Sequence, residues 1–224
     1  MLSLTPRLQA IANFIESGRA IADIGTDHAY IPVYLIEQGI IPAAYACDIR
    51  SGPLENARKT ARKYGVDSIE FVLSDGLQAL ESVQNAFSQI VIAGMGGELI
   101  SEILSKSPWC AHERFSFVLQ PMTRASLLRQ WLYENGFEIL QESLAKEQDK
   151  LYNIMKVRYT GGYARLTQAQ ALLGFVQESG DAALLREAEL RRLRKIYVAL
   201  ENKANSAAQR AQIAALIKEI EDYR

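Results

Sequence analysis

Short apolar runs alternate with longer amphipathic stretches over the first 158 residues. This alternation is typical of an α/β protein. The apolar runs predict strands at residues 20–24, 43–48, 69–73, 89–93, 115–119, 137–144 and 151–158. The amphipathic stretches predict helices at residues 6–17, 29–38, 52–64, 97–105 and 124–135. Only Gln148-Asp149-Lys150 separates the last two strands, so we expect an antiparallel hairpin at the end of a seven-stranded, mainly parallel sheet.

Local signals indicate where several of these helices begin and end. Thr5 and Pro6 are an N-cap and a first-turn proline for the first helix. Ser51 and Pro53 have the same relation to the helix at residues 52–64. Gly136 is a candidate helix stop.

The chain changes character after Gly161-Gly162, where Ala, Leu, Arg, Glu and Gln dominate and proline is absent. A short helix is predicted at residues 167–178, and two long helices at 181–203 and 206–223, separated by the breakers at 202–206. The apolar spacing favours an antiparallel coiled-coil hairpin. Its two faces would carry Leu185, Leu193, Ile196 and Leu200, then Ile213, Leu216, Ile217 and Ile220. We therefore expect a domain at residues 1–160 and a helical coiled-coil domain at 161–224.

Charge is unevenly distributed, although the formal net charge is only −1. Residues 1–155 carry 13 Lys and Arg against 18 Asp and Glu, whereas residues 156–224 carry 12 against 8. The densest basic cluster is Arg191, Arg192, Arg194 and Lys195. It could contact the phosphates of a nucleic acid, or it could be a solvated helix face.

Composition excludes several other classes of protein. No stretch approaches the roughly 18 apolar residues of a membrane span, and the first twenty residues lack a signal-peptide core, so we expect a cytoplasmic protein without a membrane partner. The only cysteines, Cys47 and Cys110, cannot form a disulfide framework or a four-cysteine zinc site, and the two histidines add little. We expect no structural metal.

The candidate chemistry begins at the end of the first strand, in Ala22-Asp23-Ile24-Gly25-Thr26-Asp27-His28-Ala29-Tyr30. A strand that ends in Asp-x-Gly and leads into a helix is typical of a nucleotide-type cofactor site, although it can also be a simple capped turn. Asp48 ends the next strand, near the spacing at which an acid meets ribose hydroxyls. Asp27 stands where a dinucleotide fingerprint has its third glycine. A carboxylate there would repel phosphates and could bind an ammonium group, which favours S-adenosylmethionine.

Further candidates follow the third, fourth and fifth strands: Asp75-Gly76, Gly94-Met95-Gly96-Gly97 and Gln120. In a doubly wound sheet the carboxyl ends of these strands line a common crevice. Asp75 is then placed for an adenine amino group, and the glycines allow close approach of a ligand. The alternatives are an ordinary turn at Asp75, a flexible loop at the glycines and a helix cap at Gln120.

Two residues near this crevice have equally balanced interpretations. His28 could orient the cofactor or contact substrate, or it could be structural. Arg7 could face the active site or only solvent. Neither position decides the function alone.

A mainly parallel sheet that ends in a β-hairpin is also the architecture of class I methyltransferases, and the motifs make this resemblance specific. Over essentially its whole length the chain resembles the bacterial tRNA adenine-22 N1-methyltransferases, a class I, S-adenosylmethionine-dependent family with a Rossmann-like fold. The matching segments are Leu4 to Leu8, Asp23 to Pro32, Cys47-Asp48-Ile49, Ser74-Asp75-Gly76-Leu77 and Ile92 to Gly97. Two positions depart from the family pattern, where Met122 replaces a common Asn and Gln89 a common Asp.

The resemblance implies S-adenosylmethionine-dependent methylation of adenine N1 in the tRNA D-loop. The cofactor-binding residues would be Asp23, Gly25, Thr26, Asp27 and His28 around the methionine moiety, Asp48 and Ile49 at the ribose, Ser74, Asp75 and Gly76 at the adenine, and Ala93, Gly94 and Met95 near the sulfonium. Substrate would be met by Gly96, Gly97 and Pro121 at the rim and by Arg191, Arg192, Arg194 and Lys195 in the tail.

N1 of adenine already has a lone pair, so the reaction needs alignment and charge stabilisation rather than a strong base. Tyr30 is a candidate to stack on the exposed or flipped base, and Arg7 and Gln120 could orient it. The alternatives are a methyltransferase for another RNA or a small molecule, a nicotinamide oxidoreductase, and a non-catalytic tRNA-binding protein on the same fold. We expect a monomer.

Overall fold

The computed structural model describes residues 1–175, 180–200 and 206–223. Seven strands form one sheet in the order β3-β2-β1-β4-β5-β7-β6, and only β7 runs in the direction opposite to the other six. The mainly parallel sheet and its terminal hairpin are thereby confirmed. The strands are β1 (Ile21–Ile24), β2 (Ala44–Asp48), β3 (Ile69–Leu73), β4 (Gln89–Gly96), β5 (Ser116–Thr123), β6 (Phe137–Glu147) and β7 (Lys150–Tyr159).

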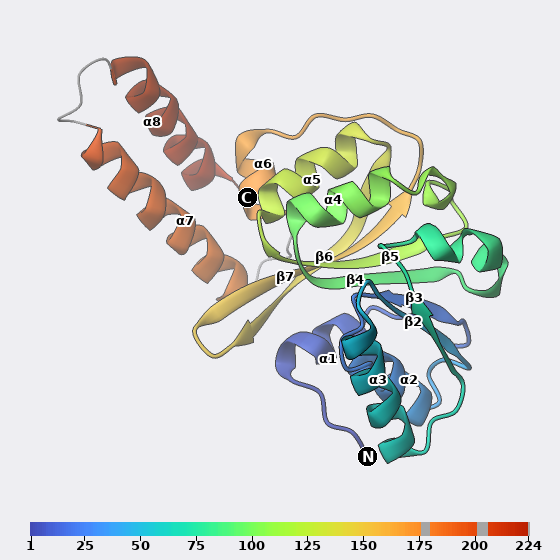
Figure 1. Cartoon of the computed structure of the whole chain (residues 1–224). Helices are drawn as coiled ribbons and strands as arrows, with labels where there is room; N and C mark the ends of the chain where they lie inside the picture. The colour runs from blue at the N-terminus through green and yellow to red at the C-terminus, as the bar shows by residue number, and fades with distance from the viewer. Residues whose placement is uncertain (176–179, 201–205, 224) are drawn as a thin grey trace.

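Helices cover both faces of this sheet (Figure 1). On one face lie α1 (Pro6–Ala12), α2 (Tyr30–Glu37) and α3 (Ser51–Tyr64), and on the other lie α4 (Gly97–Ser105), α5 (Ala125–Glu134) and the 3-10 helices η1 (Gln78–Ala86) and η2 (Pro108–Cys110). Each face has its own buried core, because both faces of a parallel sheet must be covered. The result is a three-layer sandwich with its crevice at the carboxyl ends of the parallel strands.

The first helix is shorter than the predicted range of residues 6–17. Thr5 caps it as predicted, accepting a hydrogen bond from the Leu8 amide, but the helix ends at Ala12. The reason lies far away in sequence. Buried Gln89 accepts a hydrogen bond from the Glu16 amide at 2.7 Å and donates one to the Glu16 carbonyl at 3.0 Å, which fixes a non-helical turn.

Other boundaries differ from the predictions for local reasons. Ser51 is the first residue of α3 and makes no side-chain cap, because Arg50 occupies the N-cap position. The 3-10 helices η1 and η2 were not predicted. In η1 the apolar residues Leu77, Leu80 and Val83 recur every third position, the 3-10 period, with the Leu80 amide bonded to the Leu77 carbonyl.

Strands β4 and β5 extend three and four residues further than predicted, because they continue to pair up to Gly96 and Thr123. Gly94 has a φ of +77°, and the register shifts between Ala93 and Met95 as in a β-bulge. The helix predicted at residues 124–135 is one residue shorter at each end, since α5 spans Ala125–Glu134.

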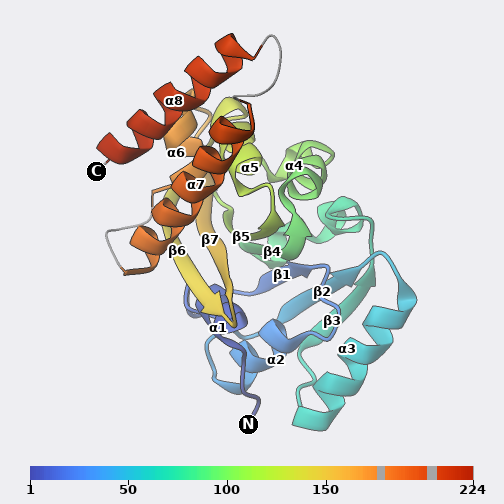
Figure 2. The ribbon, with the colours of Figure 1, turned by 90° about the vertical axis from the view of Figure 1, so that its left-hand side faces the viewer.

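The C-terminal helices are α6 (Gln168–Leu173), α7 (Gly180–Ala199) and α8 (Ala207–Asp222). Figures 1 and 2 show α7 and α8 as a helical pair at one end of the molecule, away from α3. Their shared core with α6 comprises Ala169, Leu173, Leu193 and Ile220, flanked by Leu172, Leu185, Leu190, Ile213, Leu216, Ile217 and Tyr223. The coiled-coil geometry stays a prediction. The helix predicted at residues 167–178 is too long, since α6 ends at Leu173 and Gly174 has a φ of +72°. The predicted end of the next helix at 201–203 and the breakers at 202–205 lie outside the described residues.

A buried ion pair attaches α6 to the sheet domain. Fully buried Arg129 of α5 pairs with buried Glu142 of β6, and it also donates to the Ala171 carbonyl at 2.7 Å. Glu142 in turn accepts a hydrogen bond from the Phe175 amide at 2.9 Å. Gly174 separates the two contacts with a φ of +72°, and a Cβ atom there would collide with both charged groups. The path of the chain into the C-terminal helices is therefore fixed by one charged cluster.

Candidate active site

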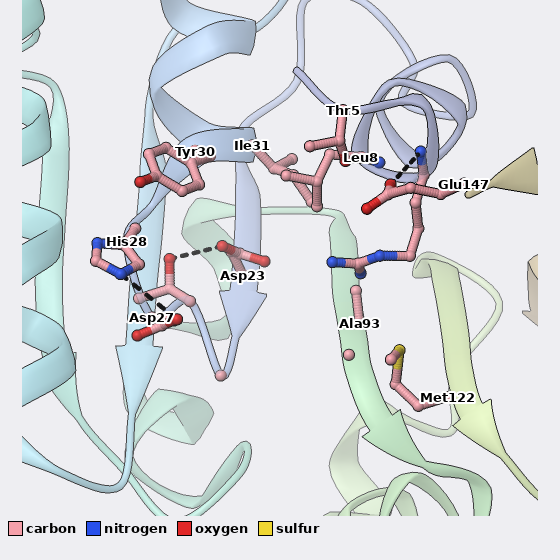
Figure 3. A pocket seen from close by; sticks show the side chains of 14 residues that line it. Thr5, Leu8, Asp23, Asp27, His28, Tyr30, Ile31, Ala93, Met122 and Glu147 are labelled. Atoms are coloured by element: carbon pink, nitrogen blue, oxygen red, sulfur yellow. Dashed lines mark hydrogen bonds and ion pairs between the residues drawn. The ribbon is translucent and has the colours of Figure 1, made fainter. Parts of the chain in front are cut away.

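A cavity of about 410 Å³ opens at the carboxyl ends of β1 and β4, next to α1 (Figure 3). It lies at the crevice where ligands bind in open α/β sheets. Its walls come from five regions of the chain. The lining residues are Thr5, Arg7, Leu8, Asp23, Gly25, Thr26, Asp27, His28, Tyr30, Ile31, Ala93, Gly94, Met122 and Glu147.

The loop after β1 has an unusual backbone that presents its side chains to the cavity. Gly25, Asp27 and Ala29 have φ values of +72°, +50° and +54°. A left-handed conformation costs energy for the two non-glycine residues and is concentrated at functional sites. The amides of Gly25 and Thr26 both donate to the Cys47 carbonyl, at 2.8 and 2.9 Å, and so secure the loop to β2.

Asp23 is buried at the bottom of this loop and carries a perturbed carboxyl group. Burial, together with the nearby Asp48 carboxylate, raises the pKa of Asp23 to about 6, against a hydrogen bond from the Thr26 hydroxyl that lowers it. The hydroxyl lies 2.6 Å from the carboxylate. Within the described residues no ion pair reaches Asp23. A buried carboxyl group of this kind is suited to a cationic ligand.

His28 and Tyr30 stack on one another at the cavity wall, with ring centroids 5.1 Å apart and planes 12° from parallel. The imidazole Nε2 also lies 3.8 Å from the Asp27 carboxylate. Tyr30 remains 40% exposed and lines the cavity, so part of its side chain is accessible to a ligand. Figure 3 shows Asp27, His28 and Tyr30 grouped on one side of the cavity.

Arg7 faces the cavity from α1 and is held by both ends. Its guanidinium donates to the Gln120 side-chain oxygen at 2.8 Å, and its backbone amide donates to the Glu147 carboxylate at 3.2 Å. Hydrogen bonding to Thr5 and Arg7 lowers the pKa of Glu147. The cavity thus contains one guanidinium against three carboxyl groups, those of Asp23, Asp27 and Glu147.

Gln120 is fully buried and does not line the cavity, in contrast to its predicted contact with the base. Its oxygen accepts from both Arg7 and the Gly94 amide, at 2.8 and 3.2 Å, and its nitrogen donates to the Pro121 carbonyl at 3.0 Å. It does not cap α5 either. Gln120 therefore connects Arg7 to the bulge of β4.

Several predicted cofactor residues surround the cavity without lining it. Asp48 is buried and accepts a hydrogen bond from the Arg50 amide at 3.0 Å, while Ile49 beside it is 59% exposed. The Ser74 hydroxyl donates to the Gly76 carbonyl at 2.8 Å and shapes the turn that exposes Asp75. Met95 packs against Gly25, where a Cβ would overlap its methyl group. These groups follow β2, β3 and β4 along one edge of the sheet.

The predicted substrate residues at the rim have packing roles in this structure. Pro121 is buried opposite Met95 in the sheet. Gly97 is also buried, and a Cβ there would lie 2.5 Å from the Arg124 carbonyl oxygen. Gly96 pairs with Thr123. None of the three lines the cavity.

The basic tail cluster lies on α7 and does not line the cavity. Three of its cations form ion pairs, Arg191 with Glu187 at 3.1 Å, Arg192 with Glu189 at 2.7 Å and Arg194 with Glu221 at 2.6 Å. Lys195 is exposed. Much of the cluster's charge is therefore balanced within the helical pair.

Sequence reasoning did not assign Thr5, Leu8, Ile31, Met122 or Glu147 to the site. Ile31 follows the loop after β1, and Met122 follows Gln120, so strand-end placement could have found both. Glu147 had no local signal. It reaches the cavity because β6 extends to the tip of the hairpin and packs beside α1.

In residues 1–175, 180–200 and 206–223, no helix is long and apolar enough to cross a membrane. The same residues contain no group of three His, Cys, Asp or Glu side chains that could hold a metal ion.

The strand order, the antiparallel hairpin at the end of the sheet and the acidic cavity at the end of β1 together define a protein of the class I methyltransferase type. A family model described as a methyltransferase domain matches residues 4–155. The tRNA (adenine(22)-N(1))-methyltransferase of Bacillus subtilis is 30% identical to this chain, over 98% of this chain and 95% of its own length.

Two solved structures extend the similarity to the whole chain. Streptococcus pneumoniae Sp1610 in complex with S-adenosyl-L-methionine has a TM-score of 0.83 and 31% identity, covering 98% of this chain and 99% of that one. M. capricolum TrmK in complex with S-adenosyl-homocysteine has a TM-score of 0.79 and 30% identity, with coverages of 98% and 97%. The chain belongs to the family of tRNA (adenine(22)-N(1))-methyltransferases.

Proposed function

We propose that this protein transfers the methyl group of S-adenosylmethionine to N1 of adenine 22 in tRNA. The observation that carries the proposal is the cavity with one guanidinium and three carboxyl groups, in a chain related over 98% of its length to a tRNA (adenine(22)-N(1))-methyltransferase. A cationic sulfonium cofactor suits such a cavity. The pyrophosphate of a nicotinamide dinucleotide does not, because like charges at this range repel.

The residues after β1 fit the amino-acid end of this cofactor. The buried Asp23 carboxylate, without an ion-pair partner in the described part of the chain, and the exposed Asp27 can both accept from an ammonium group. Asp48 and Asp75 follow the neighbouring strands at the places for ribose and adenine, and exposed Ile49 offers an apolar surface to the adenine ring.

Arg7, Tyr30 and Glu147 are placed to act on the target base. The part-exposed ring of Tyr30, which lines the cavity, can stack on a flipped adenine. The guanidinium of Arg7, which lines the cavity, can orient the base, while Gln120 positions Arg7. Methylation at N1 makes the adenine cationic, and the ionised Glu147 offsets this charge. S-adenosylmethionine supplies the electrophilic methyl group, so no covalent nucleophile on the chain is required.

We assign residues 1–160 to the methyltransferase domain and 161–224 to a helical domain that supports tRNA binding. The proposed partner is tRNA, and the protein is proposed to act as a cytoplasmic monomer without a metal. Residues Gly96, Gly97 and Pro121 act in this scheme by shaping the rim, since they are packed against neighbouring elements.

Methyl transfer from labelled S-adenosylmethionine to an unmodified tRNA transcript tests this function, with the product mapped by reverse-transcription stops. We expect a stop at position 22, lost in a transcript in which A22 is replaced by G. Arg7→Ala should reduce kcat/KM for tRNA by about 100-fold, because positioning groups of this kind contribute about 2–4 kcal/mol. Transfer at another nucleotide, or to no RNA despite confirmed cofactor binding, would refute the assignment.

A further inference from the structure

A second cavity, of about 390 Å³, adjoins the site cavity. Thr5, Leu8 and Tyr30 line both, so these three side chains form the wall between them. The remaining walls come from the N-terminal segment and from α3. They are Leu2, Ser3, Leu4, Thr60, Lys63 and Tyr64.

The two cavities differ in charge. The site cavity contains three carboxyl groups, whereas the lining of the second cavity contains no carboxyl group and one ammonium group, that of Lys63. Its Nζ lies 5.3 Å from the centroid of the Tyr64 ring. An aromatic ring with an adjoining cation is the combination with which proteins bind single-stranded RNA, by stacking on a base and binding a phosphate.

The outer face of α3 continues this positive charge. Lys59, Arg62 and Lys63 are all exposed. Among the described residues none of the three is within 4.0 Å of a carboxylate, whereas the arginines of the α7 cluster are paired. Residues three and four apart share one face of a helix, so the three cations form one patch beside the second cavity.

We propose that the second cavity binds a nucleotide adjacent to the target adenine in the substrate RNA strand. Tyr64 stacks on the base of this nucleotide and Lys63 binds its phosphate, while Tyr30 lies between the two bases. The proposal rests on the proposed function and names where the strand enters the site. It assigns to α3 an RNA contact that the sequence had suggested only for the rim of the site and for the tail.

The first test uses Lys63→Gln and Tyr64→Leu, with Lys106→Gln as a control for the loss of a surface lysine, since Lys106 is an exposed lysine at the end of α4 that pairs with Glu102. We expect KM for tRNA to rise about 3- to 10-fold in Lys63→Gln and about 5- to 50-fold in Tyr64→Leu, from a lost phosphate contact and a lost stacking contact. The salt dependence of tRNA binding by Lys63→Gln should fall by about 0.7–0.9 in logarithmic slope.

A calorimetric measurement with S-adenosylmethionine accompanies these assays. We expect the cofactor Kd of both variants to match that of the wild type, which shows that the fold and the site cavity are intact. If KM for tRNA in Lys63→Gln rises no more than in the Lys106→Gln control, the proposed subsite is wrong. This surface variant keeps the test decisive even if Tyr64→Leu fails to fold.

A second test locates the nucleotide with tRNA transcripts that are abasic at position 21 or 23. Removal of the stacked base should weaken wild-type binding but leave Tyr64→Leu little changed, giving a coupling in a double-mutant cycle. Additive losses at both positions would overturn the stacking contact. Failure of the proposed function is a different result, because it would be seen as absent transfer by the wild type to the unmodified transcript.

Discussion

At the scale of single residues, the sequence predicted the part of the cavity formed by the loop after β1. It missed the lining residues Thr5, Leu8, Ile31, Met122 and Glu147. Nine of the lining residues were candidates: eight lie between the end of β1 and the first residue of α2, or in β4, where strand ends of a parallel sheet converge, and Arg7 comes from the segment that carries the family resemblance. Gln120 was placed in the right region, but its burial and its bonds to Arg7 and Gly94 depend on side-chain packing. Glu147 was missed because nothing near it in sequence indicates that a hairpin tip meets α1.

The raised pKa of Asp23 predicts a pH dependence of cofactor binding. A cationic ligand binds the ionised carboxylate, so affinity for S-adenosylmethionine should fall by about tenfold between pH 7 and pH 5, as Asp23 protonates through about pH 6. Titration calorimetry at both pH values measures this change. Asp23→Asn should bind weakly at pH 7 and lose the dependence, whereas Asp27→Asn should weaken binding and keep it. An unchanged profile in Asp23→Asn would contradict the role of this carboxyl group.

The same pKa also affects the ligand-free protein. The folded state holds a proton with a pKa of about 6, while the unfolded chain releases it near 3.8. Asp23 therefore contributes stability that is fully present below about pH 4 and is lost as the pH rises through about 6. A cation bound beside the ionised Asp23 carboxylate would offset this loss of stability.

At the scale of helices and strands, elements with strong periodicity were predicted well, and their ends were not. The end of α1 depends on Gln89, which lies 73 residues away from the Glu16 backbone that it binds. The extensions of β4 and β5 depend on their pairing with one another around a bulge at Gly94. Such ends are set by tertiary contacts that no local pattern contains.

Close packing at the start of α4 gives a prediction at this scale. A Cβ at Gly97 would lie 2.5 Å from the Arg124 carbonyl, so Gly97→Ala should destabilise the protein by about 1–3 kcal/mol. Chemical denaturation measures the loss. Gly52→Ala is a suitable control because no atom lies within 4 Å of its added Cβ. If Gly97→Ala lowered the unfolding free energy no more than Gly52→Ala does, the backbone around Gly97 would have to move without an energetic cost, and the prediction would be wrong.

At the scale of the whole molecule, the buried pair of Arg129 and Glu142 couples the sheet domain to the C-terminal helices. Arg129→Met should cost about 3–5 kcal/mol of unfolding free energy, because it leaves the Glu142 carboxylate buried without its partner. The double variant Arg129→Met with Glu142→Met should recover much of this loss. Denaturation of the three proteins measures both effects. Equal losses in the single and double variants would mean that the ion pair is not the cause.

Which basic residues are neutralised by nearby carboxylates, and which are not, is visible only in the folded molecule. The sequence placed the excess of positive charge in the tail, but there three arginines pair with glutamates, while α3 in the acidic half presents a basic face. A net charge counted along the chain does not show which cations are balanced in space. The family resemblance, rather than composition, implied an RNA partner, and neither indicated the basic face of α3 that we propose as its contact surface.

The hydrogen bond between the Arg7 amide and the Glu147 carboxylate bears on when the cavity is completed during protein synthesis. Synthesis proceeds from the N-terminus, and the loop after β1 is made early. The wall of the cavity is complete only once Glu147, 140 residues later in the chain, can accept the hydrogen bond from the Arg7 amide. A nascent chain that lacks β6 would carry the loop after β1 without Glu147, and so without this wall of the cavity. We therefore expect the cofactor cavity to be complete only after the hairpin of β6 and β7 has emerged.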